Sequence, residues 1–557
     1  MQRFFLLILT NLSFTLLFAS RAVTEWKSYL QPDGTVLTLT LTGDEHFSYY
    51  QDIAGNKYAL DETGLFRRLS QSEIKQSSRR RAFNVSLLNG HPEWDANRTY
   101  RQLVILVEFE NCSFSIADPL TFYQRMFNET DYNYRDGAGC VADYFRDQSN
   151  GLFNLQFDIY GPYIGRNKPT SSKTEGSDLG ESVFQKATRQ FVEEHPDMDF
   201  SPYDWDGNGE LDQVVYIYAG YSGNQAGYKN YIWPNSGNFV AVKTGDGHVI
   251  SLYSASAEHW ANEELCGIGT MCHEFSHCLG LPDIYPTSEK ALSPYIVDEW
   301  DLMDGGTVTN YGWCPPNYSP MEKMLLGWLE PVELTEDKNI EGLKTIADGG
   351  DAYLIKHTDD EFLLLENRQW KGWDYGLPGR GLVVYHVYFD QLSWSMNMVN
   401  IYNGYPYYSL VAADRLNYLN WVDIIRQRGL TSQFADSERR LHCLALSSAA
   451  YPYATDSTEF VNNCLTDTSL PSSVMYTNNA SGSRHLSKPI TDITQNDDGT
   501  ISFVFHASMP EAIIAPRSTI TESSAVYTLT GRKVQSNAIN ELPKGIYLTG
   551  GKKIVIK

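Results

Sequence analysis

Apolar and polar positions alternate along the chain in blocks that predict an α+β protein. Residues 102–109 and 214–219 are almost continuously apolar, which is typical of strands buried on both faces of a sheet. Helices are predicted over residues 140–147, before an Asn-Gly turn, and over residues 263–279. The chain up to about residue 330 is therefore predicted to form one mixed unit of strands and helices.

Beyond this unit the pattern changes to short strands separated by turns. Apolar runs at 352–355, 362–365, 382–385 and 501–506 predict a β-rich part. Near the N-terminus, residues 36–41 alternate as a strand does, after an Asp-Gly turn. A polar, basic stretch at 71–81 separates this strand from the first buried one and predicts an exposed linker that a protease could cut.

The composition is that of an ordinary globular protein with an acidic surface. A length of 557 residues suggests about three or four domains. The net charge of −24 disfavours nucleic acid as a partner, because an acidic surface repels the phosphate backbone. The eight cysteines could form disulfides in an exported protein, but the sequence does not choose among the pairings.

The N-terminus has the pattern of a secretory signal peptide. Arg3 precedes a mostly apolar run from Phe4 to Ala19, and Ser20 and Ala22 fit a cleavage site of small residues. An uncleaved membrane anchor is the alternative. Since no other apolar stretch reaches about 20 residues, the mature protein is not predicted to span a membrane. We expect it to be secreted or held at the cell surface.

The segment HEFSHCLGLPD, from His273 to Asp283, carries the chemistry of a metal site. Residues four apart lie on one face of a helix, so His273 and His277 can offer two imidazoles to one ion. Glu274 lies about 100° further round the helix, where it can reach a metal-bound water without being a ligand. This spacing predicts a zinc site with Glu274 as the general base.

The residues after the second histidine add to this interpretation. Gly280 can adopt positive φ and end the helix, and Pro282 prevents its continuation. The chain can then turn back so that Asp283 supplies a third ligand, which leaves an open position typical of catalytic zinc. The apolar positions of the helix lie opposite the histidine pair, which is predicted to face a cleft. These positions are Ile268, Met271, Cys272, Phe275 and Leu279.

This segment resembles the metzincin signature, H-E-x-x-H-x-x-G-x-x-H/D. Together with the WDLMDGG segment at 300–306, it is similar to the M6 (immune inhibitor A-like) metalloprotease family. The resemblance implies a metzincin-like zincin domain with a mixed sheet and an active-site helix, Zn²⁺ as the cofactor, and protein or peptide substrates. It also implies that Met303 forms a structural turn beneath the metal. Zinc would activate a water for attack on the peptide, with Glu274 taking the proton.

Two alternatives stay open at this point. A distant glutamate as the third ligand, in place of Asp283, would make the protein a gluzincin-type peptidase. Alternatively, the chain is a surface binding or adhesion protein whose zincin domain is inactive, although an intact Glu274 beside both histidines favours the enzyme.

A second segment, DWDGNGELD, has the pattern of a calcium loop. Oxygen-bearing side chains fall at positions 1, 3, 5 and 9, which are Asp204, Asp206, Asn208 and Asp212. Position 12 is Val215 rather than glutamate, so the loop is not a complete EF-hand. The alternative is an acidic turn that leads into a strand.

The terminal segments add two further resemblances. Residues 24–95 resemble the propeptide of the same family, and no cysteine precedes Cys112, which excludes a cysteine as the blocking ligand. Asp33, Asp44 and Asp52 are the candidates for a blocking carboxylate. The tail, with the segments VYTLTGRKV, LPKGIY and KKIVIK, resembles the C-terminal sorting domain of type IX secretion, which implies a secretion machinery as partner. An ordinary accessory β-domain is the alternative.

The whole pattern predicts five segments. These are a signal peptide at 1–22, a propeptide at 23–95, a zinc metalloprotease catalytic domain at 96–330, a β-rich accessory domain at 331–510 and a C-terminal sorting or β domain at 511–557.

Overall fold

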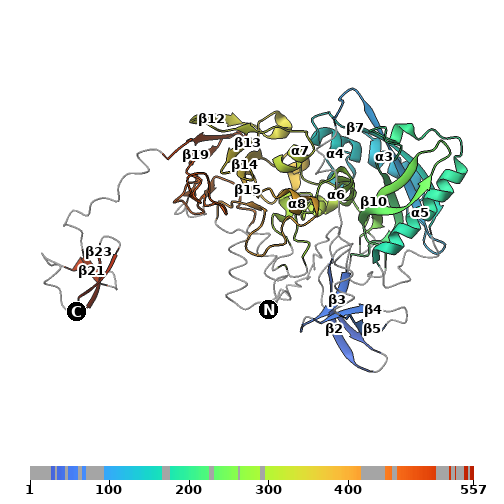
Figure 1. Ribbon diagram of the computed structural model, residues 1–557, viewed down its shortest axis with the longest axis horizontal. Coiled ribbons are helices and arrows are strands. Elements are labelled where there is room, and N and C mark those ends of the chain that lie inside the picture. The colour runs from blue at the N-terminus through green and yellow to red at the C-terminus, as the bar shows by residue number, and fades with distance from the viewer. Residues whose placement is uncertain are drawn as a thin grey trace, which may run out of the picture.

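The computed structural model in Figure 1 describes the main body of the chain over residues 93–165, 176–224, 231–260, 264–288, 291, 295–414, 446–454 and 461–509. It also describes residues 27–31, 34–43, 48–54, 56–60, 65–70, 526–528, 533–534, 545–549 and 552–556. The predicted signal peptide at 1–22 and the predicted linker at 71–81 lie outside these residues.

A five-stranded sheet forms the centre of the unit predicted at 96–330. Its strands are β6 (Thr99–Glu108), β7 (Asn154–Ile164), β8 (Val214–Tyr221), β9 (Asn235–Lys243) and β10 (Val249–His259). The strand order is β7-β6-β8-β10-β9, and the edge strand β9 runs antiparallel to β10 while the other pairs are parallel. The apolar runs at 102–109 and 214–219 form β6 and β8, which confirms them as buried strands.

Helices cover both faces of this sheet (Figure 1). They are α3 (Pro119–Asn128), α4 (Val141–Gln148), α5 (Gly176–Glu194) and α6 (Ile268–Leu279). The helix α7 (Pro320–Leu325) contacts β14 (Glu361–Arg368) in the following part instead. Short 3-10 turns are η1 (Tyr134–Asp136), η2 (Ser201–Tyr203), η4 (Asp298–Trp300) and η5 (Gly306–Gly312). Alternate side chains of β6 point to opposite faces. Val104 and Leu106 pack with α3, α4 and α6, whereas Leu103 and Ile105 pack with α5.

The helix predicted over 263–279 starts later than expected. Cys266 donates its backbone N–H to the carbonyl of Glu258 at 2.8 Å, and Leu265 forms a bridge with His259. These residues therefore continue the pairing of β10, and α6 begins only after Gly267. The other end is as predicted, because Gly280 has φ 109° and closes the helix.

The β-rich part after residue 330 contains two packed sheets. The first has the order β11-β13-β14-β15-β16 and the second β12-β20-β19. Their strands are β11 (Val332–Glu333), β12 (Lys338–Leu343), β13 (Tyr353–Lys356), β14 (Glu361–Arg368), β15 (Gly381–Tyr388), β16 (Tyr408–Leu410), β19 (Ile490–Gln495) and β20 (Ile501–Phe505). Further short elements are η6 (Ile346–Asp348), η7 (Gly372–Gly376), α8 (Gln391–Ser395), β17 (Tyr453–Ala454) and β18 (Val461–Asn462).

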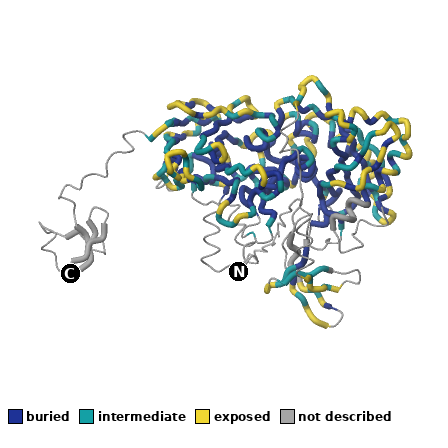
Figure 2. Tube along the Cα trace, in the orientation of Figure 1, coloured by how far each residue is buried: buried dark blue, intermediate teal, exposed yellow. Residues whose placement is uncertain are grey.

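One hydrophobic core runs across residue 330. On β14, Leu363 and Leu365 face the second sheet, while Phe362 and Leu364 join the core that also contains α4 and α6. Figure 2 shows buried segments through the interior of both parts. Because the two parts share this core, the site helix is supported from both sides.

Separate small sheets lie near the two ends of the chain. The N-terminal sheet is a meander of β1 (Lys27–Leu30), β2 (Val36–Gly43), β3 (Ser48–Asp52), β4 (Lys57–Leu60) and β5 (Phe66–Arg68). The C-terminal sheet has the order β22-β21-β23-β24. Its strands are β21 (Val526–Thr528), β22 (Lys533–Val534), β23 (Gly545–Thr549) and β24 (Lys552–Ile556). The N-terminal sheet contacts the main body where Leu39 and Tyr50 pack against Trp233.

Two observations concern membrane-spanning helices and disulfides. Among the described residues, no helix combines the length and the apolar character needed to cross a bilayer. The seven cysteines in the described part of the chain form no disulfide.

Candidate metal centre

Helix α6 is held in place by close backbone contact. A Cβ atom on Gly269 would lie 2.2 Å from the carbonyl oxygen of Thr307 in η5, so only glycine permits this approach. The predicted apolar stripe packs into the core with α4 and the sheet. The opposite side is also covered, because His273 is 0% and His277 3% exposed. The sequence predicts that the histidine pair faces a cleft. In the structure both imidazoles are buried instead.

The structure brings His273, His277 and Asp283 together. The two Nε2 atoms lie 3.1 Å apart, and the Oδ1 atom of Asp283 lies 3.3 Å from each of them. In a tetrahedral zinc site with metal–ligand bonds of about 2.0–2.2 Å, neighbouring ligand atoms are separated by roughly 3.3–3.5 Å. The three atoms thus have nearly the spacing of one face of such a tetrahedron.

The hydrogen bonds of the other ring nitrogens direct the lone pairs towards this point. Nδ1 of His273 lies 3.0 Å from the carbonyl oxygen of Leu302, and Nδ1 of His277 lies 2.8 Å from that of Leu281. A carbonyl can only accept, so each Nδ1 carries the proton and each neutral ring presents an unprotonated Nε2. Three acceptor atoms then converge without a hydrogen atom between them. This donor set fits a cation, and two imidazoles with one carboxylate suit zinc.

The buried carboxylate and the two imidazoles shift one another's pKa values. Burial acts to raise the pKa of Asp283, but the neighbouring His277 and His273 outweigh it and hold this pKa well below its usual range. Burial acts to lower the pKa of His273, but the adjacent Asp283 carboxylate and the nearby Glu274 charge give a net increase. Glu274 is itself fully buried beside His273 on α6. A compact negative charge at Asp283 and Glu274 therefore favours a cation at the imidazoles.

Met303 lies in a buried turn directly after the carbonyl that orients His273. Its N–H donates to Oδ1 of Asp301 at 2.8 Å, and its carbonyl accepts from the N–H of Ile284 at 2.7 Å. The turn thus connects the support of His273 to the loop that carries Asp283. Burial raises the pKa of Asp301 to about 6.

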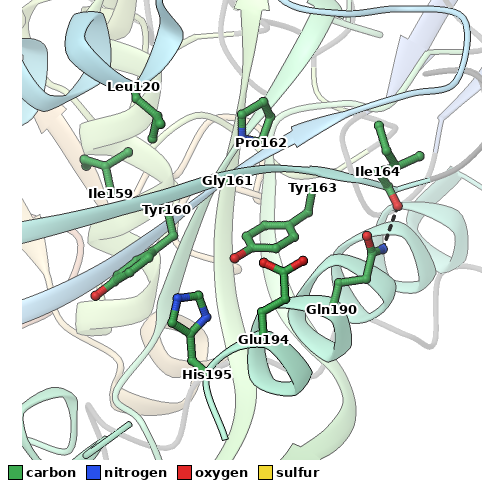
Figure 3. Close-up of a pocket in the computed structure, with 10 residues that line it drawn as sticks. All are labelled: Leu120, Ile159, Tyr160, Gly161, Pro162, Tyr163, Ile164, Gln190, Glu194 and His195. Carbon is green, nitrogen blue, oxygen red and sulfur yellow. Dashed lines mark hydrogen bonds between the residues drawn. The ribbon is translucent and has the colours of Figure 1, made fainter.

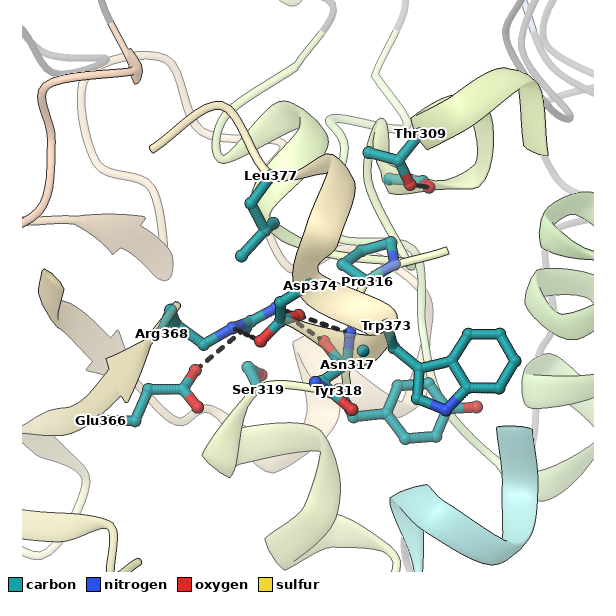
Figure 4. A network of polar contacts seen from close by, with 12 residues as sticks. Thr309, Pro316, Asn317, Tyr318, Ser319, Glu366, Arg368, Trp373, Asp374 and Leu377 are labelled. Atoms are coloured by element: carbon teal, nitrogen blue, oxygen red, sulfur yellow. Dashed lines mark hydrogen bonds and ion pairs between the residues drawn. The ribbon is translucent and has the colours of Figure 1, made fainter. Parts of the chain in front are cut away.

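A buried polar network joins β14 and η7 to the segment around Asn317 (Figure 4). Arg368 is 1% exposed and forms a two-point ion pair with Asp374, at 2.8 and 2.6 Å. The same guanidinium donates to Oε1 of Glu366 at 3.0 Å and to the carbonyl of Asn317 at 3.2 Å. The network belongs to β14 and η7, so residues beyond 330 support the region of the candidate site.

Asn397 also belongs to the site, although sequence analysis does not point to it. It donates from Nδ2 to Oδ2 of Asp283 at 2.7 Å, and its Oδ1 accepts the N–H of Asp283 at 2.6 Å. The ring of Tyr285 lies nearly parallel to that of His273, with centroids 6.4 Å apart. Tyr285 follows the motif closely enough to be suspected, but Asn397 is 114 residues from its partner and the sequence carries no signal for it.

Two glutamates, Glu263 and Glu264, lie shortly before the histidines in the sequence. Glu264 is exposed and pairs with Arg135, and Glu263 lies outside the described residues. In the part of the chain that the structure describes, the acidic residue gathered with the histidine pair is Asp283.

The predicted calcium loop closes on itself around Asp204. Its carboxylate accepts from the backbone N–H groups of Gly207, Asn208 and Gly209 at 2.8–3.1 Å. Asp206 and Asp212 bring carboxylate oxygens close to those of Asp204, whereas Asn208 uses its Oδ1 to accept from a backbone N–H. Burial, together with the charges of the neighbouring aspartates, raises the pKa of Asp212 to about 7.

A surface groove of about 550 Å³ lies elsewhere, between β7, α3 and α5 (Figure 3). Tyr160, Tyr163, Gln190, Glu194 and His195 contribute polar side chains to its lining, which also includes Gly161 and Pro162. None of the residues of the candidate metal group lines it.

A comparison with curated proteins finds a similar chain. This relative is immune inhibitor A from Bacillus thuringiensis subsp. alesti. The two are 24% identical over 300 residues, a match that takes in 44% of this chain and 43% of the relative. The chain thus spans less than half the length of the relative that it matches. No protein-family model matches the chain. The name of this relative is that of the family that the HEFSHCLGLPD segment resembles.

Proposed function

We propose that this chain is a secreted zinc-dependent endopeptidase of the immune inhibitor A-like kind. The observation that carries the proposal is the convergence of the two Nε2 atoms and the Asp283 carboxylate at 3.1–3.3 Å, with both Nδ1 atoms bonded to carbonyls. The similarity to immune inhibitor A supports the same reading. The metzincin-like fold, the third ligand and the general base are parts of this proposal.

In the proposed site, zinc is held by His273, His277 and Asp283. A zinc ion bound there would supply Lewis acidity, which lowers the pKa of water towards neutrality and polarises a peptide carbonyl. The carbonyls of Leu302 and Leu281 keep the imidazoles in the tautomer that can bind a metal. The carboxylate of Asp283 offsets part of the charge of the ion.

Glu274 has the role of general base in this proposal. It directly follows His273 on α6 and is buried, and its charge raises the pKa of that histidine. From there Glu274 can accept a proton from the attacking water and return it to the leaving amine. No covalent attachment of the substrate is needed, and the mechanism therefore requires no nucleophilic side chain.

The terminal units and the acidic loop complete the proposal. The small N-terminal sheet, which packs on Trp233, is a propeptide that keeps the exported enzyme latent. Of the candidate blocking carboxylates, Asp52 is tied into its own turn by Asn56 and Tyr58, whereas Asp33 and Asp44 lie outside the described residues. The C-terminal strands are a sorting unit, and the loop around Asp204 binds Ca²⁺.

The direct test is casein hydrolysis by the exported form after mild trypsin treatment to release the N-terminal unit. We expect hydrolysis that a zinc chelator abolishes and added Zn²⁺ restores, and that is lost in His273→Ala with its zinc. Calcium should raise the melting temperature in the wild type but not in Asp204→Asn. A folded, zinc-loaded protein without peptidase activity would instead favour a binding or adhesion protein.

A further inference from the structure

Asn397 and Asp283 form a closed two-bond contact in the interior. The amide of Asn397 accepts the Asp283 backbone N–H at 2.6 Å and donates to Oδ2 of the same residue at 2.7 Å. Asn397 is 6% and Asp283 1% exposed, so water does not replace either bond easily. Oδ2 of Asp283 is thereby engaged, and Oδ1 is the oxygen that faces the two imidazoles.

The chemistry of this contact fixes the orientation of the amide. If the amide were reversed, its NH₂ group would face a backbone N–H and its carbonyl oxygen would face a carboxylate. Both arrangements are repulsive, so only the observed orientation satisfies all four groups. The direction in which the Asp283 carboxylate points is therefore set by Asn397.

The backbone around Asn397 is anchored to the same loop. Its φ is 54°, in the left-handed region that asparagine tolerates better than most residues. Thr287 donates its hydroxyl to the carbonyl of Asn397 at 2.6 Å, and Asn400 donates to the carbonyl of Ile284 at 2.7 Å. The segment after α8 thus holds the loop that carries Asp283 at several points.

We propose that Asn397, which comes from the β-rich half of the chain, is the positioning residue that presents Oδ1 of Asp283 to the metal. This inference rests on the proposed zinc site. It implies that zinc affinity depends on the contact between the two halves of the chain. It also implies that Asn397 acts only through Asp283, since none of its hydrogen bonds goes to either histidine.

Three variants separate this role from a merely structural one. Asn397→Gly removes the amide but keeps a backbone that glycine adopts freely at positive φ. Asn150→Gly is the matched control, because Asn150 has φ 51° and is exposed in the turn after α4. Asp283→Ala/Asn397→Gly tests whether Asn397 still matters when its partner is gone.

The measurement is the affinity of the full chain for Zn²⁺ alone, by competition with a chromophoric chelator. We expect Asn397→Gly to weaken binding about 10–100-fold, as for other residues that orient metal ligands. Asn150→Gly should bind like the wild type. In the Asp283→Ala background, Asn397→Gly should cause less than about a twofold further loss, because the contact it breaks is already absent.

Other outcomes would overturn the inference in distinguishable ways. If Asn397→Gly binds zinc within about threefold of the wild type, or weakens binding equally in both backgrounds, Asn397 does not act through Asp283. If Asn397→Gly does not fold, Asn397→Asp serves instead, since it keeps the acceptor but repels Asp283; unchanged affinity there would also refute the role. A wild-type chain that binds zinc no better than His273→Ala would remove the proposed function itself.

Discussion

Removal of Arg368 tests whether the buried polar network holds the two halves of the chain together. In Arg368→Met the side chain keeps most of its volume but loses its charge and its hydrogen bonds to Asp374, Glu366 and Asn317. Glu366 and Asp374, which are 1% and 3% exposed, would then be buried carboxylates without their cation. Breaking a buried pair in this way costs about 3–5 kcal/mol, because the remaining charge cannot be solvated.

The expected loss is large enough to measure by urea or thermal unfolding followed by tryptophan fluorescence. A cost of about 3–5 kcal/mol corresponds to a fall in melting temperature of roughly 6–20 °C for a domain of ordinary size. The matched control is Arg125→Met, which breaks an exposed pair with Glu129 at the end of α3 and should cost less than about 1 kcal/mol. Equal effects of the two substitutions would refute the reasoning, because burial would then not decide the cost.

Three further predictions concern other parts of the molecule. Burial acts to raise the pKa of Glu361, but His386, the Thr477 hydroxyl and two backbone N–H groups lower it to about 2. The ionised carboxylate therefore stabilises the fold above about pH 4.5, and this stabilisation is lost as the pH falls towards 2. Glu361→Gln should therefore flatten the acid side of the stability curve, and an unchanged curve would contradict this. Gly269→Ala should lower the melting temperature despite the higher helix propensity of alanine, because its Cβ would meet the Thr307 carbonyl; a rise would be inconsistent with that contact. Trp233→Ala should speed amide exchange in β2 and β3 by about tenfold or more, since the N-terminal sheet loses its anchor, and unchanged exchange would show that the sheet does not depend on it.

The parts that sequence predicts well depend on local patterns. The continuous apolar runs identified β6 and β8, because strands buried on both faces need apolar residues at every position. The end of α6 could be predicted because Gly280 is the natural residue at φ 109°. The beginning of α6 could not, since the pairing of Cys266 with the Glu258 carbonyl depends on how the chain returns to β10.

The same distinction applies to the candidate site. The spacing of His273 and His277 follows from helix geometry, so both could be named from the sequence together with Glu274. The carbonyl of Leu302 and the amide of Asn397 could not, because they reach the site only through tertiary packing. An asparagine at 397 has no local pattern that distinguishes it from a surface residue.

The central claim is that Glu274 is the general base of a zinc peptidase, and Glu274→Gln tests it most directly. The variant keeps the size of the side chain but cannot accept the proton. In the zinc-loaded, trypsin-activated form we predict that kcat for peptide hydrolysis falls by about 10²–10⁴-fold while zinc content and melting temperature stay the same. Hydrolysis at the wild-type rate by zinc-loaded Glu274→Gln would contradict the account and would place the reaction elsewhere in the chain.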